Sequence, residues 1–269
     1  MTNGNDWKNH KLRGRVKSIH SEVANLSQSS GGWIEETRRP LSTIAFNENG
    51  CIVKELRYDL DGYLSEIGFT KYDATGNKSE VVFQNQRGGL LTSFVYEYDD
   101  AGKLLGCVST QAHGLIIKQR SRATYDEAGK KAGELWRYED GTLSRRYVYK
   151  YGSNGQLAEQ LLYTYDDDGS IEEKITSIYD DKGNVIESAC FDKDDRPIED
   201  RTEWKYNDDG EAIETATFDL RGDLYSTTSY SYDFDTQRNW IKRLEVYRIA
   251  KTGFETRVVS YRALKYYQP

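Results

Sequence analysis

The sequence contains very little proline, cysteine, histidine or methionine. Of its 269 residues, 3 are proline, 3 are cysteine, 3 are histidine and 1 is methionine. The cysteines, Cys51, Cys107 and Cys190, are odd in number, far apart and without a CxxC pair. This pattern favours reduced, half-buried thiols over a disulfide framework or a metal site. We therefore expect no metal and no cofactor.

Long apolar runs and an excess of positive charge are also missing. The first residues, MTNGNDWKNHKLRG, lack the apolar segment of a signal peptide, and no run is long enough to span a membrane. An outer-membrane barrel would need an export signal and an apolar belt facing the lipid, and we recognise neither in the sequence. We expect a cytoplasmic chain as written, or an exported one if a leader has been removed. A formal net charge of −7 argues against nucleic acid as a partner.

Tyrosine and glycine, in contrast, are abundant. The chain has 21 Tyr and 23 Gly, and Tyr, Val, Ile and Thr suit the pleated surface of a sheet. Hydrophobic residues make up 37% and charged residues 30%, too little apolar material for the thick core of a globular enzyme of this size. The composition predicts an all-β fold with a thin or curved sheet.

An internal repeat organises the chain. An aromatic anchor recurs at intervals of 26, 26, 27, 26, 28, 27 and 26 residues, and a glycine follows it by four places in seven of the copies. The anchors are Phe46, Tyr72, Tyr98, Tyr125, Tyr151, Tyr179, Tyr206 and Tyr232. A second, weaker turn near the middle of each unit divides it into two segments of β-strand length. Each unit of about 26 residues therefore predicts a β-hairpin.

The residue pattern of the repeat has a structural explanation. An Asp or Asn after the anchor opens a type I turn through its own backbone, and the Gly supplies the positive φ that closes it. Between turns, apolar and polar residues alternate, so one sheet face is aromatic and the other charged. The residues assigned to structural turns are Asp73, Gly76, Asp99, Gly102, Asp126, Gly129, Gly155, Asp180, Gly183 and Gly210.

We expect one domain over residues 1–269, built as a sequential antiparallel meander of about 18 strands. Its predicted parts are a frayed tail at 1–11, an opening hairpin at 12–46, a repeat array at 46–235 and a closing hairpin at 236–269. A flat sheet of this width would twist and expose its edges. The sheet is therefore expected to roll into a wide barrel or an open shell.

The stretches YDATGNKSE, YDDAGKLLG and YDDKGNVIE resemble the YD repeats of RHS-type bacterial proteins. The segments LRGRVKSIHSE and DTQRNWIKR are similar to the opening and closing motifs of YD-repeat proteins, so the resemblance spans about residues 11 to 262. It implies a β-strand array, which in the large RHS proteins is a hollow shell around a C-terminal toxin. We expect no toxin domain after the array in this chain, and we recognise no self-cleaving aspartyl-protease motif in it.

No cluster of residues in the sequence indicates catalysis, and we expect no enzyme. Most Asp residues occupy turn positions, which explains them without chemistry. Four glutamates stand eight places after an anchor, and we expect a ladder on the polar face, solvated or paired with Lys and Arg; they are Glu80, Glu159, Glu187 and Glu214. The spacing of a calcium loop and the Gly-x-Ser-x-Gly motif of a hydrolase are both absent.

The aromatic residues allow two interpretations. If they face the inside of a roll they are its packing, and if they face water they could stack on a sugar. The residues considered for ligand stacking are Tyr96, Tyr98, Trp136, Tyr149, Tyr163, Trp204, Tyr230 and Trp240. The direction in which the rings point separates the two cases.

The function predicted from the sequence is a non-enzymatic binding or scaffold protein. Its repeat-built surface or lumen would engage a protein partner, which the resemblance suggests is a toxin or effector. The alternatives are a carbohydrate-binding module that uses exposed Tyr and Trp, and an enzyme with a polar site in its lumen.

Overall fold

The computed structural model describes residues 5–113 and 115–268. Over this range the chain forms one short helix and 19 β-strands, all paired antiparallel in a single sheet. The elements are α1 (Asp6–Asn9), β1 (Val16–Ser29), β2 (Gly32–Glu35), β3 (Arg39–Phe46), β4 (Ile52–Tyr58), β5 (Leu64–Tyr72), β6 (Lys78–Gln84), β7 (Leu90–Tyr98), β8 (Leu104–His113), β9 (Leu115–Tyr125), β10 (Lys131–Tyr138), β11 (Leu143–Tyr151), β12 (Leu157–Tyr165), β13 (Ile171–Tyr179), β14 (Val185–Phe191), β15 (Arg201–Tyr206), β16 (Ala212–Phe218), β17 (Leu224–Phe234), β18 (Trp240–Ile249) and β19 (Glu255–Tyr266).

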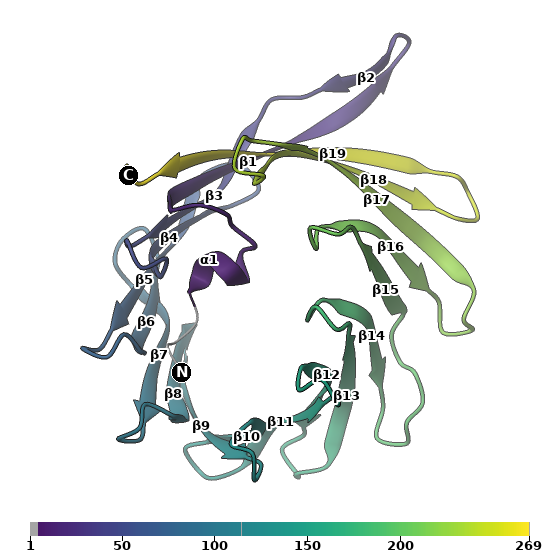
Figure 1. The fold of residues 1–269 in the computed structure, drawn as a ribbon. Helices are drawn as coiled ribbons and strands as arrows, with labels where there is room; N and C mark the ends of the chain where they lie inside the picture. Colours follow the sequence, from purple (N-terminus) through teal and green to yellow (C-terminus); the bar gives the residue numbers. More distant parts are fainter. Residues whose placement is uncertain (1–4, 114, 269) are drawn as a thin grey trace.

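The sheet closes into a barrel, because β1 pairs with β3 on one side and with β19 on the other. Eighteen strands make the barrel wall, and β2 pairs with the last four residues of β1, so that this hairpin projects beyond the wall (Figure 1). The predicted meander and its closure into a barrel are confirmed. A barrel of 16 to 18 strands is wide enough to leave an aqueous lumen.

The repeat turns lie together at one end of the barrel, which we call the anchor end. Neighbouring strands are antiparallel, so every second hairpin turn returns to the same end. In the turn after β5, the Asp73 carboxylate accepts hydrogen bonds from the backbone N–H groups of Thr75 and Asn77, both at 2.9 Å. Gly76 follows at φ +85°, a conformation that a side chain disfavours.

Two turns keep this geometry without glycine. Asp195, after β14, and Arg238, after β17, both have φ 63° at the position that Gly occupies elsewhere. Next to the first of these turns the sheet is at its narrowest, because β14 and β15 share only two in-register pairs, Glu187 with Glu203 and Ser188 with Thr202.

The aromatic face of the sheet is the lumen face. Helix α1 lies inside the ring of strands (Figure 1), and its Asp6 carboxylate accepts a hydrogen bond from the anchor Tyr72 hydroxyl at 3.2 Å. Alternation along β11 then places Tyr147 and Tyr149 on the same face as the anchor of that strand, and their rings stack at 6.3 Å.

The charged face points outwards and carries the predicted glutamate ladder. Each of the four glutamates pairs with a cation on a neighbouring strand, which confirms the expectation of ion pairs. The pairs are Glu80 with Lys71 (2.6 Å), Glu159 with Lys150 (2.7 Å), Glu187 with Arg201 (3.0 Å) and Glu214 with Lys205 (2.6 Å).

The N-terminal segment corrects one expectation. Residues 1–11 were expected to fray; residues 1–4 lie outside the described residues, but 6–9 form α1, and Asp6 is only 3% exposed. The Trp7 indole donates to the Val16 carbonyl at 2.8 Å and packs on the small core of Val16, Ile19 and Phe46. A polar sequence is ordered here because the barrel offers its polar groups partners that the local sequence does not show.

Candidate functional site

A ladder of tyrosine hydroxyls runs along the lumen at the anchor end. Six anchor tyrosines donate a hydrogen bond to a backbone carbonyl 20 or 21 residues upstream, with distances from 2.5 to 2.9 Å. The pairs are Tyr72 with Ile52, Tyr98 with Lys78, Tyr125 with Leu104, Tyr151 with Lys131, Tyr206 with Val185 and Tyr232 with Ala212. Each accepting carbonyl belongs to the first residue of the strand after the preceding repeat turn.

These contacts explain why the anchor is tyrosine. The ring fills the lumen side of the wall while the hydroxyl satisfies a carbonyl that the hairpin leaves free. Burial raises the pKa of Tyr232 to about 12, and that of Tyr96, which lies two residues before the anchor Tyr98, also to about 12. The phenols are therefore neutral hydrogen-bond donors at neutral pH.

The aromatic residues considered for stacking do not form a common platform. Seven lie on the lumen face of strands spread around the barrel, whereas Tyr163 pairs in register with Arg146 on the outer face. Within the described residues no two of the eight stack on each other, and the closest aromatic neighbour of Trp240 is the anchor Tyr232 at 6.2 Å. The rings are therefore mainly packing, although Tyr230 and Trp240 share a charged neighbourhood described below.

The N-terminal segment spans the lumen at the anchor end. On one side Asp6 accepts from the Ile52 N–H at 2.8 Å and pairs with Lys78 at 3.2 Å. On the other side the Lys11 ammonium donates to the Asn184 side chain at 3.0 Å and to the Gly210 carbonyl. The segment therefore ties β4–β6 to the turns after β13 and β15, and it partly fills this mouth of the barrel.

Arg13 continues these contacts. Its guanidinium pairs with Asp209 at 2.7 Å, and its backbone N–H donates to the Asn239 side chain at 2.7 Å. Arg238 pairs with the same Asp209 carboxylate at 2.6 Å, and the two arginines hold the pKa of Asp209 below its ordinary value. Ion pairs at this end of the barrel therefore join the N-terminal segment to the turns after β15 and β17.

A second group of polar side chains lies across the lumen, on β8, β10 and β11. Glu134 pairs with Lys131 at 2.5 Å, and the Lys131 ammonium lies 5.3 Å from the Tyr149 ring. Burial raises the pKa of the nearby Cys107 thiol to about 11. A thiol with such a pKa is almost fully protonated at neutral pH and is a poor nucleophile.

Metal chemistry and membrane helices have no support in the described residues. Within residues 5–113 and 115–268, no three or more His, Cys, Asp or Glu side chains gather where they could hold a metal ion. In the same range no helix has the length and apolar character needed to cross a bilayer. The three cysteines are free thiols; Cys51 is half-buried, and Cys107 and Cys190 are buried.

A basic hollow of about 500 Å³ lies on the outer face of β8, β9 and β10. Alternation along β9 places Lys118, Arg120 and Arg122 on this face, because Gln119 and Ser121 between them are buried. Arg137 adds a fourth cation, and Val108 and Leu135 contribute apolar surface.

The cations of this hollow are only partly neutralised. Lys118 lies 3.3 Å from Glu139, and Arg120 lies 3.7 Å from Glu97. Arg137 donates to the Gly141 carbonyl at 2.9 Å, and Arg122 makes no ion pair or hydrogen bond within the described residues. The hollow is thus a positive site on a chain of net charge −7.

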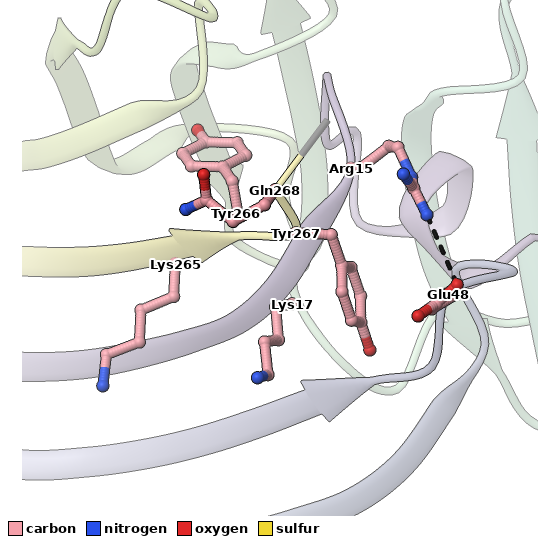
Figure 2. A pocket seen from close by; sticks show the side chains of 7 residues that line it. All are labelled: Arg15, Lys17, Glu48, Lys265, Tyr266, Tyr267 and Gln268. Carbon is pink, nitrogen blue, oxygen red and sulfur yellow. Dashed lines mark ion pairs between the residues drawn. The ribbon is translucent and has the colours of Figure 1, made fainter.

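A second outer hollow, of about 710 Å³, lies where the C-terminal end of β19 meets β1 (Figure 2). Tyr267 donates through its hydroxyl to the Phe46 carbonyl at 2.6 Å, and Tyr266 points to the opposite side of the strand. Lys17 lies 5.8 Å from the Tyr267 ring, and Arg15 pairs with Glu48 at 3.6 Å. These side chains lie at the closing seam of the barrel, the junction between β1 and β19.

Sequence reasoning missed the basic hollow, although its signal was present. The stretch KQRSR carries cations at 118, 120 and 122, a period of two that places them on one face of a strand. Arg137 could not have been added from the sequence, because its place beside them depends on how β10 pairs with β9.

No family model matches the sequence, and no curated protein matches it either. Solved structures show distant likenesses. A porin-like protein from Bacteroides uniformis matches 93% of this chain and 96% of its own at 14% identity and a TM-score of 0.43. A porin-like protein from Bacteroides vulgatus matches 92% and 98% at 12% identity and a TM-score of 0.33. A DUF1329 family protein from Desulfovibrio piger matches 94% and 86% at 8% identity and a TM-score of 0.25. Likenesses this weak do not assign a function.

Proposed function

We propose that this protein is a non-enzymatic binding protein that engages a protein partner, and that the partner docks an acidic segment in the basic hollow on β8–β10. The observation that carries the proposal is the gathering of four cations around an apolar floor on the outer face of the barrel. An acidic chain segment with an apolar side chain matches this surface in charge and in polarity.

Charge complementarity favours this hollow over the rest of the outer wall. Elsewhere the wall carries cross-strand pairs such as Lys71 with Glu80, which present no net charge to a partner. In the hollow, Arg122 is free within the described residues and can form a bidentate pair with a carboxylate. The repeat resemblance supports a scaffold role, with a toxin or effector as the partner.

The direct test uses a fluorescently labelled oligo-glutamate peptide and its anisotropy. The double reversal of Arg120→Glu and Arg122→Glu should weaken binding by about tenfold or more, because it replaces two attractive charges with two repulsive ones. The matched control, Lys17→Glu with Lys265→Glu in the hollow of Figure 2, changes the net charge equally and should stay within about twofold.

The two variants also identify the natural partner. The wild-type chain is used as bait in a lysate of the source cells, and bound proteins are compared with those bound by each variant. A partner captured by the wild type and by the Lys17/Lys265 variant, but lost with the Arg120/Arg122 variant, supports the proposal. Equal loss in both variants would show that only overall charge matters.

A further inference from the structure

A cluster of two arginines and one tryptophan lies on the lumen face near the closing seam. The Arg262 guanidinium of β19 lies 3.6 Å from the centre of the Trp240 ring of β18. Arg243 lies 5.3 Å from the same ring and 5.8 Å from the Tyr230 ring of β17. Arg243 of β18 pairs in register with Ser260 of β19. Arg262 lies two residues after Ser260 and therefore on the same face of the sheet as Arg243.

The two arginines differ in what they bind. Arg243 donates to the Glu245 carboxylate from Nε at 3.0 Å and from Nη2 at 2.6 Å, so its charge is met. Arg262 makes neither a hydrogen bond nor an ion pair with any described residue. A guanidinium has five N–H donors, and here they have no protein acceptor.

The free donors of Arg262 remain open to the lumen. Within the described residues, the buried side-chain polar atoms without a partner are Ser109 Oγ and Thr164 Oγ1, and no nitrogen of Arg262 is among them. One face of the guanidinium is covered by the ring of Trp240, a residue that is only 7% exposed. The cation is thus half desolvated, which strengthens its attraction for an anion.

Among the described residues, Arg262 is the arginine of this cluster that no carboxylate pairs with, because Glu245 is bound by Arg243. Glu211 acts on Arg262 through space but lies beyond ion-pair distance, and the charge of Arg243 opposes it. Burial lowers the pKa of Arg262 to about 10, which still leaves it protonated at neutral pH. Lys11, which also acts on Glu211, donates hydrogen bonds to the turns after β13 and β15.

We propose that Arg262 is the anchor of a carboxylate-binding site inside the barrel, with Trp240 as its support and Tyr230 beside it. A carboxylate meets the guanidinium through two parallel N–H···O bonds, the geometry that this side chain is built for. The aromatic rings favour a carboxylate attached to an apolar or aromatic body. This lumen site is separate from the outer hollow of the proposed function.

The experiment titrates benzoate into the full-length protein and follows binding by calorimetry. The wild type should bind benzoate in a saturable manner. Arg262→Met should bind it at least tenfold more weakly, because methionine keeps an apolar side chain but lacks the guanidinium. The matched control is Arg145→Met. Arg145 also faces a lumen tryptophan, Trp136 at 5.5 Å, but its Nη2 already donates to Gln119 at 2.9 Å, so this change should stay within about twofold.

Two further variants keep the test decisive. Glu211→Gln removes a negative charge near the site and should tighten benzoate binding several-fold. Arg262→Lys keeps the positive charge but lacks the planar guanidinium, so it should lose part of the affinity for benzoate. If circular dichroism shows that Arg262→Met does not fold, the Arg262→Lys variant serves as the test. The proposal is overturned if wild type shows no saturable binding, if Arg262→Met or Arg262→Lys binds like wild type, or if Arg145→Met loses as much.

The proposed function and this inference can fail independently. Arg262→Met should bind oligo-glutamate at the outer hollow like wild type, and the Arg120/Arg122 reversal should bind benzoate like wild type. Loss of oligo-glutamate binding in Arg262→Met would show that the peptide reaches the lumen and would contradict the separation of the two sites.

Discussion

The hydroxyl of Tyr98 donates a hydrogen bond of 2.9 Å to the carbonyl oxygen of Lys78. This bond joins the end of β7 to the start of β6 through a side chain, in addition to the backbone ladder between these two strands. It recurs around the anchor end, so each copy stabilises the open end of one hairpin.

Tyr98→Phe should lower the free energy of unfolding by about 1 kcal/mol, the usual net value of one such hydrogen bond. Tyr163→Phe is the matched control, because that hydroxyl lies on the outer face and makes no hydrogen bond within the described residues. Urea unfolding followed by tryptophan fluorescence gives both values. Equal effects of the two changes would mean that the ladder adds nothing to stability.

Asp6→Ala should lower the free energy of unfolding by about 2–3 kcal/mol, because hydrogen bonds to a charged group are among the stronger ones. The change removes the acceptor of the Ile52 N–H and Tyr72 hydroxyl and the partner of Lys78. Lys8→Ala, on the exposed side of α1, should change little. Limited proteolysis should also cut the N-terminal segment faster in Asp6→Ala only, and unchanged protection would contradict its role as an anchor.

Asp195→Gly should raise the free energy of unfolding by up to about 1 kcal/mol, since glycine adopts φ 63° without the steric cost that a side chain brings. The gain is limited by loss of the exposed ion pair with Lys174. Asp194→Gly, one place earlier and without positive φ, should destabilise, because it adds freedom only to the unfolded chain. Thermal unfolding compares the two variants, and destabilisation by both would refute the argument.

Stability should fall at alkaline pH. Burial raises the pKa of Tyr96 from 10.0 to about 12, so the folded state holds the phenolic proton more tightly than the unfolded state. This contribution is fully present below pH 10 and is lost as the pH rises from 10 towards 12. Tyr96→Phe, which removes the titrating group and keeps the ring, should make the urea midpoint less sensitive to pH in this range. An unchanged pH dependence would assign the loss to other tyrosines.

The repeat made the strands and turns predictable because their causes are local. The Asp73 carboxylate bonds backbone groups two and four residues on, and Gly76 supplies a conformation that its own φ requires. Alternation placed the glutamate ladder correctly, because period two is a property of a single strand. That Asp6 is ordered and buried was not predictable from the sequence, since its hydrogen-bond and ion-pair partners lie 46 to 72 residues away.

The candidate sites divide in the same way. Three cations of the outer hollow could be seen in the sequence, but their neighbour Arg137 required the pairing of β9 with β10. Arg262 and Trp240 are more than twenty residues apart and share no motif, so no pattern in the chain joins them. Their contact depends on β18 and β19 curving around the lumen with both side chains inside.

The sequence by itself determined an all-β meander of about 26-residue hairpins, its turn chemistry and the division of the sheet into an aromatic and a charged face. These follow from short-range backbone preferences and from the alternation of side chains along a strand. The tertiary structure decided that β1 closes the sheet between β3 and β19, that the aromatic face is the lumen, and that the N-terminal segment enters it. Those outcomes depend on contacts between residues far apart in the chain, which become fixed only when the whole wall is assembled.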